Sequence, residues 1–331
     1  MRVLVLGGTV FAGRAVVEEA LRRGHSVTIF HRGEHGADAF GDAVERILGD
    51  RNQEAHLKRL KGRLFDVAVD MCGFNGRAVG ASARLLADSC ERYVFVSSGS
   101  VYTGWPERPV DESSEVFADP VEGDGHYGEG KAAAERAAEA AMPGRVVHSR
   151  SGLIVGPHEN IGRLPFWLRR MARGGEVLAP GQPGRPVQWI DARDHAGFLL
   201  DAPPGTFNVV SPPRPFTMGS VLAACAEATG AGARLVWVSD DALLEAGIEP
   251  WTQVPMWTPD RPEWAFAYAV DSSRALASGL RIRPVEETVN DTWDWMRSIS
   301  DPAREGAYRV EFRAKDLDPA LEAGLLRGAS S

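Results

Sequence analysis

Short continuous apolar segments alternate with helix-like segments through the first half of the chain. This alternation is typical of strands that a parallel sheet buries on both faces. The apolar segments predict strands at residues 3–6, 27–30, 44–48, 67–70, 93–97 and 145–149. The segments between them predict helices at residues 12–23, 53–60, 77–89 and 127–141. The repeated strand–helix order predicts an α/β fold with a doubly wound parallel sheet, whose ligands bind at the carboxyl ends of the strands.

The pattern changes after Gly156-Pro157, where proline and glycine become frequent and eight of the nine tryptophans follow. We expect a smaller, irregular C-terminal region at residues 156–187 and 213–331 that supplies the substrate-binding surface. Residues 188–200 predict a strand and a helix, and residues 207–210 predict another strand. We expect 188–212 to rejoin the sheet of residues 1–155, and the last thirty residues to form a loosely attached tail.

Composition narrows the possible functions. A chain of 331 residues with 44% hydrophobic and 25% charged residues is typical of a soluble globular protein. Its formal charge of −8 argues against binding to nucleic acid or to an anionic membrane surface. The chain lacks an apolar run near the ~18 residues that a membrane span needs, so we expect a cytoplasmic protein. The spacing of Cys72, Cys90 and Cys225 favours buried thiols over disulfides or a zinc site, and we expect no metal.

A glycine-rich loop joins the first predicted strand to the first predicted helix. Backbone N–H groups at a helix N-terminus can hold a pyrophosphate, although a tight turn also explains such glycines. Val10 stands where a middle glycine would allow the closest approach of a phosphate. From this loop we expect cofactor contacts by Gly7, Gly8, Thr9, Val10, Phe11 and Gly13.

The end of the second predicted strand indicates which dinucleotide binds. An acidic residue at this point would take the ribose hydroxyls of NAD, but His31 and Arg32 stand here instead. Their charge and donors suit a 2′-phosphate, so we infer NADP(H) in preference to NAD(H), the alternative being a solvated turn arginine. Asp50, after the third strand, could accept a hydrogen bond from the adenine amino group, or it could cap a helix.

Tyr127 and Lys131 lie four residues apart, so a helix places both on one face. The chain has five tyrosines and very few lysines, and chance seldom produces this spacing. A tyrosine with its reference pKa of about 10 exchanges protons poorly near neutral pH, and a nearby ammonium lowers that pKa. A serine hydroxyl can hold a substrate carbonyl while nicotinamide carries the hydride. Ser98, at the end of the fifth strand, is placed to do so.

The sequence resembles the short-chain dehydrogenase/reductase superfamily, in its extended or atypical NAD-dependent epimerase/dehydratase-like branch. The residues that carry the resemblance are the glycine loop, Tyr127 with Lys131, and the segments 97–102, 156–157 and 190–194. The resemblance implies a Rossmann dinucleotide-binding domain at residues 1–155. It also implies that Tyr127 is the general acid/base, that Lys131 binds the nicotinamide ribose, and that Ser98 orients the carbonyl. The loop that contains Met71 and Cys72 would lie beside the cofactor.

Departures from the family pattern shape the expected reaction. Dehydratases of this family carry an Asp-Glu pair where this chain has Gly99-Ser100, which disfavours water elimination. Leu153 stands where many sugar-nucleotide epimerases carry asparagine. We therefore expect an NADP(H)-dependent oxidoreductase that interconverts a ketone and a secondary alcohol on a small molecule. The alternatives are an epimerase with a transient keto intermediate, and a cofactor-sensing or RNA-binding protein on the same fold.

Further residues are weaker candidates. Ser100, His126 and Arg163 are candidate substrate contacts, although the arginines of residues 163–173 also fit a solvated basic helix face. The tryptophans at 251, 257 and 264 are more typical of a small core than of a binding surface. The alanine-rich helix at 132–141 could pack against a partner's helix in a homodimer.

Overall fold

The computed structural model describes residues 1–36, 38–120, 125–299 and 317–329. Its centre is a seven-stranded sheet in which every neighbouring pair of strands is parallel. The order is β11 (Gly205–Val209), β6 (Val146–Ser151), β5 (Cys90–Ser98), β4 (Phe65–Asp70), β1 (Arg2–Leu6), β2 (Ser26–His31) and β3 (Glu45–Leu48). The doubly wound sheet is confirmed, and the chain order reverses at the β1–β4 boundary, where such folds bind ligands.

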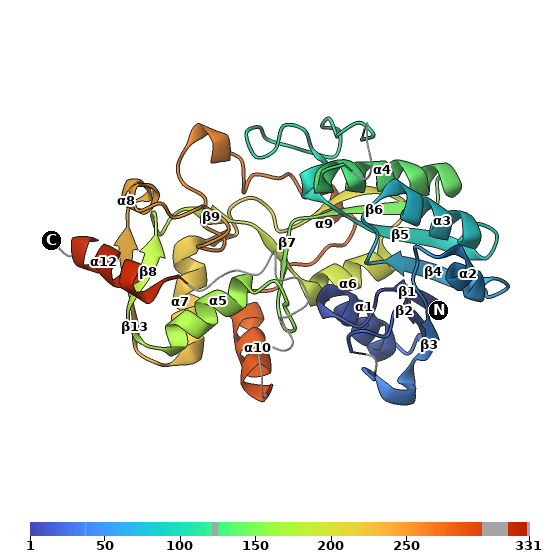
Figure 1. The fold of residues 1–331 in the computed structure, drawn as a ribbon, viewed down its shortest axis with the longest axis horizontal. Coiled ribbons are helices and arrows are strands. Elements are labelled where there is room, and N and C mark those ends of the chain that lie inside the picture. Colours follow the sequence, from blue (N-terminus) through green and yellow to red (C-terminus); the bar gives the residue numbers. More distant parts are fainter. Residues whose placement is uncertain (37, 121–124, 300–316, 330–331) are drawn as a thin grey trace.

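Helices cover both faces of this sheet (Figure 1). One face packs against α1 (Phe11–Arg22), α6 (Ala192–Asp201) and the short α9 (Ser273–Ala277). The other packs against α2 (Glu54–Leu57), the 3-10 helix η2 (Lys58–Leu60), α3 (Gly76–Leu86) and α4 (Tyr127–Ala141). Short 3-10 helices η1 (Gly41–Ala43), η3 (Gly99–Val101) and η4 (Pro262–Trp264) lie in loops. The strands bury apolar side chains on both faces, which explains their continuous apolar pattern.

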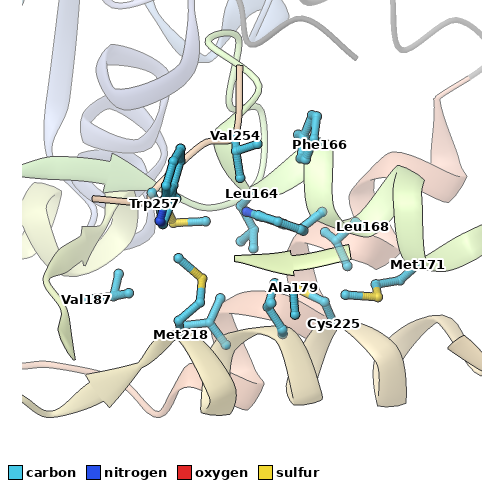
Figure 2. Close-up of a cluster of buried hydrophobic side chains, with 14 of the residues drawn as sticks. Leu164, Phe166, Leu168, Met171, Ala179, Val187, Met218, Cys225, Val254 and Trp257 are labelled. Atoms are coloured by element: carbon cyan, nitrogen blue, oxygen red, sulfur yellow. The ribbon is translucent and has the colours of Figure 1, made fainter. Parts of the chain in front are cut away.

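A second lobe lies to the left of the sheet and its flanking helices in Figure 1. Its helices are α5 (Arg163–Ala172), α7 (Met218–Thr229), α8 (Asp240–Glu245), α10 (Val285–Ser298) and α12 (Pro319–Ala329). Its two-stranded sheets pair β8 (Gly175–Pro180) with β13 (Ala233–Val238), and β9 (Pro186–Val187) with β12 (Phe216–Thr217). Figure 2 shows the separate core of this lobe, where α5, α7 and β8 enclose Trp257 and its apolar neighbours.

Two segments differ from their sequence-based expectations. β10 (Trp189–Asp191) pairs with β7 (Leu153–Val155) and stays outside the main sheet, because β11 already occupies the free edge of β6. The expected loose tail falls partly outside the described residues, but α12 is docked against β8 and β13. It buries Leu326 and Glu322, and Glu322 binds Arg170 at 2.7 Å.

Glycines set the contact between α3 and α4. A Cβ atom at Gly76 would lie 3.1 Å from the Ala133 carbonyl oxygen, and one at Gly80 would lie 3.2 Å from Ala137 Cβ. The alanine-rich side of α4 is therefore covered by α3 of the same chain. A homodimer through the remaining surface of this helix stays a prediction.

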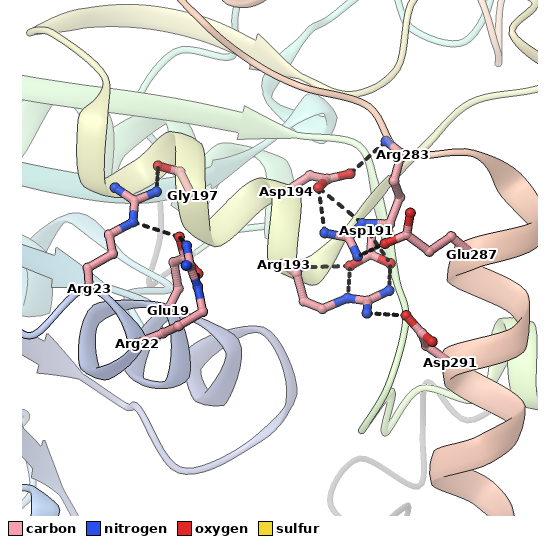
Figure 3. Close-up of polar contacts among 10 residues, drawn as sticks. All are labelled: Glu19, Arg22, Arg23, Asp191, Arg193, Asp194, Gly197, Arg283, Glu287 and Asp291. Atoms are coloured by element: carbon pink, nitrogen blue, oxygen red, sulfur yellow. Dashed lines mark hydrogen bonds and ion pairs between the residues drawn. The ribbon is translucent and has the colours of Figure 1, made fainter.

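Charged side chains join the second lobe to α6 (Figure 3). Asp191, nearly fully buried, accepts hydrogen bonds from Arg193 Nε and Nη2, and Arg193 also binds Asp291 of α10. Arg283 binds Asp194 at 2.8 Å and Glu287 at 2.8 Å. These contacts give the sequence motif at 190–194 a structural role in fixing one lobe against the other.

Candidate active site

The glycine loop lies at the carboxyl end of β1 and leads into α1. Gly7 has φ +86°, and its N–H donates to the Phe30 carbonyl of β2 at 3.0 Å. A Cβ atom at Gly13 would stand 2.3 Å from the Gly7 carbonyl oxygen, so only glycine lets the helix start so close to the strand. Val10 has an extended backbone, and the left-handed conformation falls on Phe11 at φ 40°. Valine is therefore compatible with the backbone at position 10, and the strain falls on the next residue.

The N-terminus of α1 has no side-chain cap. The first N–H groups of any α-helix lack intrahelical acceptors, and Val10 provides no capping side chain. The loop after β2 returns to this point, because a Cβ atom at Gly36 would lie 2.8 Å from the Thr9 carbonyl oxygen. The Gly13 N–H donates to the Val10 carbonyl oxygen at 3.1 Å, and this end of α1 has the partial positive charge that favours a pyrophosphate.

The residues expected to select the cofactor surround the end of β2. His31 is buried; its Nδ1 accepts from the Gly33 N–H at 3.2 Å, and its Nε2 is buried without a partner among the described residues. Burial, and then Arg46, lower the pKa of His31, which favours the neutral ring. Arg32 is half exposed and lies 2.8 Å from Glu34. Asp50 accepts from the Asn52 N–H at 2.9 Å within the turn before α2, and the helix-cap alternative is wrong because Gln53 occupies the N-cap.

A buried ionic network under the glycine loop was missed by sequence reasoning. Arg51 forms a two-pronged ion pair with Asp70 at the end of β4, and it donates to Ser82 Oγ at 2.6 Å. Asp70 also accepts from the Tyr93 hydroxyl at 2.6 Å and from the Cys72 N–H at 3.2 Å. The network fixes the loop that contains Met71 and Cys72. Burial raises the pKa of the Cys72 thiol, and this half-buried side chain leaves no room for a Cβ atom at Gly7.

Gly128 allows α4 to pack directly against the residues that follow β5. A Cβ atom at Gly128 would lie 2.1 Å from the Ser100 carbonyl oxygen, so the helix and η3 are in direct backbone contact. One turn beyond Lys131 on α4, Glu135 binds Arg150 of β6 at 2.8 Å, and both side chains are buried. These contacts bring the tyrosine–lysine face of α4 against the serine-containing turn.

Lys131 is enclosed beneath this contact. Its side chain is 3% exposed, and Nζ donates to the Val96 carbonyl oxygen of β5 at 2.7 Å. Nζ also lies 5.0 Å from the Phe74 ring centroid and 4.9 Å from that of Phe95. Burial lowers the pKa of Lys131, and the proximity of Tyr127 acts against that shift. The ammonium has two further N–H donors beyond the one that meets Val96.

Tyr127 shares this environment, as the sequence predicts. Its ring centroid lies 5.8 Å from Lys131 Nζ and 6.5 Å from the ring centroid of Phe74. It is 46% exposed, which is unusual for a large aromatic side chain and leaves it accessible to a ligand. The buried cation and the exposed phenol therefore form one unit at the carboxyl edge of the sheet.

The two candidate serines follow β5 directly. Ser98 Oγ accepts from the Ser100 N–H at 3.1 Å and lies 3.2 Å from Ser100 Oγ, so it caps η3. This turn keeps both hydroxyls next to the start of α4. His126 is exposed immediately before Tyr127, and its backbone N–H binds Glu129 at 2.8 Å.

Arg163, the remaining candidate substrate contact, belongs to the second lobe. It is the first residue of α5, and the groups whose charge bears on it are Glu159, Tyr268 and Tyr127. The interpretation of residues 163–173 as a solvated basic face is wrong for Arg163 and Arg170, whose side chains are 21% and 12% exposed. The basic side chains are instead held by Glu159 and by Glu322.

The site meets the physical requirements of a dinucleotide. It combines a helix N-terminus without a side-chain cap, glycines that leave no space for a side chain, a buried nitrogen of His31 without a partner among the described residues, and a buried ammonium beside an exposed tyrosine. Within the described residues, no group of three or more His, Cys, Asp or Glu side chains is arranged to hold a metal. None of the helices described in the structure is both long enough and apolar enough to cross a membrane.

Comparisons with known proteins agree with this geometry. Residues 78–202 match the model of the NAD dependent epimerase/dehydratase family. A bifunctional pinoresinol-lariciresinol reductase of Sinopodophyllum hexandrum is 41% identical over 56 residues, 17% of this chain and 17% of the reductase. The chloroplast stem-loop binding protein of 41 kDa b of Arabidopsis thaliana is 31% identical over 114 residues, 30% of each chain. These matches span less than a third of either relative.

Similarity in fold covers more of the chain than similarity in sequence. The NAD complex of UDP-glucose 4-epimerase from Thermus thermophilus superimposes with a TM-score of 0.66 at 20% identity. The superposition covers 90% of this chain and 99% of the epimerase chain.

Proposed function

We propose, from the match of residues 78–202 to the NAD dependent epimerase/dehydratase family model, that the chain is an NADP(H)-dependent oxidoreductase. It interconverts a ketone and a secondary alcohol on a small molecule. The observation that carries the proposal is the placement of buried Lys131 beneath the exposed phenol of Tyr127, with Ser98 at the adjoining strand end. A structural tyrosine would be expected to bury its ring, and a structural lysine to reach solvent.

Each side chain has a distinct role in this reaction. The cofactor, when bound, supplies hydride exchange with the substrate carbon. Tyr127 gives its hydroxyl proton to the carbonyl oxygen during reduction, or removes a proton from the alcohol during oxidation. Lys131 stabilises the phenolate and offers its remaining donors to the nicotinamide ribose. Ser98 donates to the same carbonyl oxygen and so fixes its direction.

The preference for NADP(H) rests on the end of β2. No acidic side chain ends this strand, and the guanidinium of Arg32 lies in a half-exposed position from which it can exchange Glu34 for a 2′-phosphate. The buried, unpartnered Nε2 of His31 supplies a further polar atom beside that position.

The epimerase alternative uses the same three side chains. It is favoured by the similarity of the fold to UDP-glucose 4-epimerase, and disfavoured by Leu153 at the expected asparagine position. The two reactions differ in cofactor balance: a reductase consumes NADPH with each turnover, whereas an epimerase converts substrate without net change in cofactor absorbance. The RNA-binding alternative predicts RNA affinity with a steep salt dependence, against which the acidic net charge argues.

The main experiment combines a substrate screen with a Tyr127→Phe variant. We expect the full chain to oxidise NADPH with some members of a ketone panel, and Tyr127→Phe to lower single-turnover hydride transfer by about 10²–10⁴-fold while cofactor still binds. Ser98→Ala should lower the rate strongly, and Ser100→Ala less. Hydride transfer at the parent rate in Tyr127→Phe would remove the phenol from the mechanism.

The cofactor preference is tested separately with Arg32→Ala. The loss of a charged phosphate contact should reduce the ratio of NADPH to NADH affinity by roughly tenfold or more. Arg22→Ala is the matched control, because it removes the same charge at the opposite end of α1. An affinity ratio that is unchanged in Arg32→Ala would exclude Arg32 from phosphate recognition.

A further inference from the structure

Phe74 is an exposed aromatic side chain beside the proposed catalytic tyrosine. It lies in the loop that follows β4, at the carboxyl edge of the sheet, and it is 41% exposed. Its ring centroid lies 6.5 Å from that of Tyr127, and the two rings are inclined at 46°, so neither covers the face of the other. Among the described residues, no other phenylalanine, tyrosine or tryptophan is exposed. The two exposed aromatic rings of the described chain therefore lie side by side at the candidate active site.

The residues on either side of Phe74 hold its backbone in place. A Cβ atom at Gly73 would lie 2.3 Å from Val79 Cγ2, so the loop packs directly against α3. On the other side, Asn75 caps α3 by accepting from the Ala78 N–H at 2.9 Å. The ring between these two contacts thus projects from a fixed backbone, which reduces the entropy that a ligand loses by ordering the loop.

The contact of Phe74 with Lys131 accounts for only part of its ring. The Lys131 ammonium lies 5.0 Å from the Phe74 centroid and 4.9 Å from that of Phe95, which are favourable cation–π distances. Phe74 therefore helps to enclose the ammonium, which belongs to a side chain that is 3% exposed. The exposed part of the Phe74 ring is not needed for this cover. Because the ring also borders Tyr127, a molecule bound against Tyr127 lies next to Phe74 as well.

Resting on the function proposed above, we propose that the substrate carries an aromatic ring on its reacting carbonyl or carbinol carbon, and that this ring packs against Phe74. Aromatic pairs prefer centroid distances of about 4.5–7 Å and gain free energy beyond the apolar area that they bury. The 6.5 Å between Phe74 and Tyr127 lets a third ring lie at such a distance from both centroids. Phe74 is thus a specificity-determining residue that selects aryl ketones and the corresponding alcohols.

Binding of two matched ketones tests this contact independently of turnover. Acetophenone and cyclohexyl methyl ketone differ only in whether the ring is aromatic. Saturation-transfer NMR titrations of the full chain with NADP⁺, which gives no hydride to a ketone, measure the affinity of each. We expect acetophenone to bind roughly two- to tenfold more tightly. Phe74→Leu keeps an apolar side chain over Lys131 but has no aromatic face, so it should make the two affinities equal. Phe74→Tyr should retain the preference.

Leu64→Ala is the matched control, because it removes another exposed apolar side chain, at the opposite end of β4, and should leave the preference intact. Failure of acetophenone to bind, equal binding of the two ketones, or an unchanged preference in Phe74→Leu would each overturn the proposal. If Phe74→Leu instead weakened NADP⁺ binding and kept the preference, the ring would contact the nicotinamide and not the substrate. A preference for acetophenone without reduction of any ketone by NADPH would refute the proposed reaction and leave the aromatic contact standing.

Discussion

The contact between Gly128 and Ser100 gives a sharp test of how the site is assembled. A Cβ atom at position 128 would stand 2.1 Å from the Ser100 carbonyl oxygen and 3.1 Å from the Phe117 ring. Real Cβ atoms essentially never approach another heavy atom below 3.0 Å, so Gly128→Ala must move α4 or η3 by roughly 1 Å. Both contacts involve well-packed groups, and the closer one is backbone, which cannot rotate away as a side chain can.

The size of the effect follows from two opposing contributions. Alanine is favoured over glycine in a helix by about 0.5–1 kcal/mol, which would stabilise the variant. Overpacking costs about 1–3 kcal/mol and should exceed that gain. We therefore expect the free energy of unfolding to fall by about 1–2 kcal/mol. A displacement of 1 Å between Tyr127 and Ser98 should also lower the turnover rate by on the order of 10²-fold.

Urea unfolding and single-turnover hydride transfer measure the two effects, and the matched control is Gly324→Ala in α12. There a new Cβ atom would meet only Arg327 Nη2 at 4.0 Å, so we expect a small gain in stability and unchanged turnover. If Gly128→Ala were stabilised like the control and kept its activity, the close packing of α4 on η3 would not be what positions the tyrosine.

Three further predictions concern buried charge and the C-terminal helix. Glu135→Ala should lower the free energy of unfolding by about 3–5 kcal/mol, because Arg150 is left buried without its charged partner. Glu54→Ala removes the exposed partner of Lys58 in α2 and should cost less than about 1 kcal/mol, and comparable losses in urea unfolding would contradict this. Burial lowers the pKa of His195 to about 3 from 6.5, so the unfolded chain binds more protons between these values and stability should fall as pH falls through that window. His195→Gln should flatten this dependence, measured as unfolding midpoints against pH, and an unaltered slope would show that His195 does not cause it. Glu322→Ala should release α12 from Arg170 and make the C-terminal segment more sensitive to limited proteolysis, and equal cleavage rates would indicate that apolar packing alone holds the helix.

The sequence identified the parts of the site that are defined by short spacing. The glycine loop, the strand–helix order, and Tyr127 with Lys131 can each be recognised within a few consecutive residues, because helix and strand periodicity fixes which neighbours share a face. The described part of α4 begins and ends at the predicted residues, and the predicted strands of the first half all form. Local backbone geometry is enough to predict such features.

Other features depend on residues that are distant in the chain. Arg51 pairs with Asp70 across two strands. Nothing in the sequence around either residue indicates that the other will be its partner. β11 occupies the edge of β6, and β10 pairs with β7 instead. The hydrophobic pattern of the sequence does not indicate which of the two strands joins the main sheet. Arg170 fitted a solvated basic helix face, and folding of the second lobe instead buried most of its side chain against Glu322. A charge is stable inside a protein only where particular partners meet it, and those partners are brought together by the tertiary structure alone.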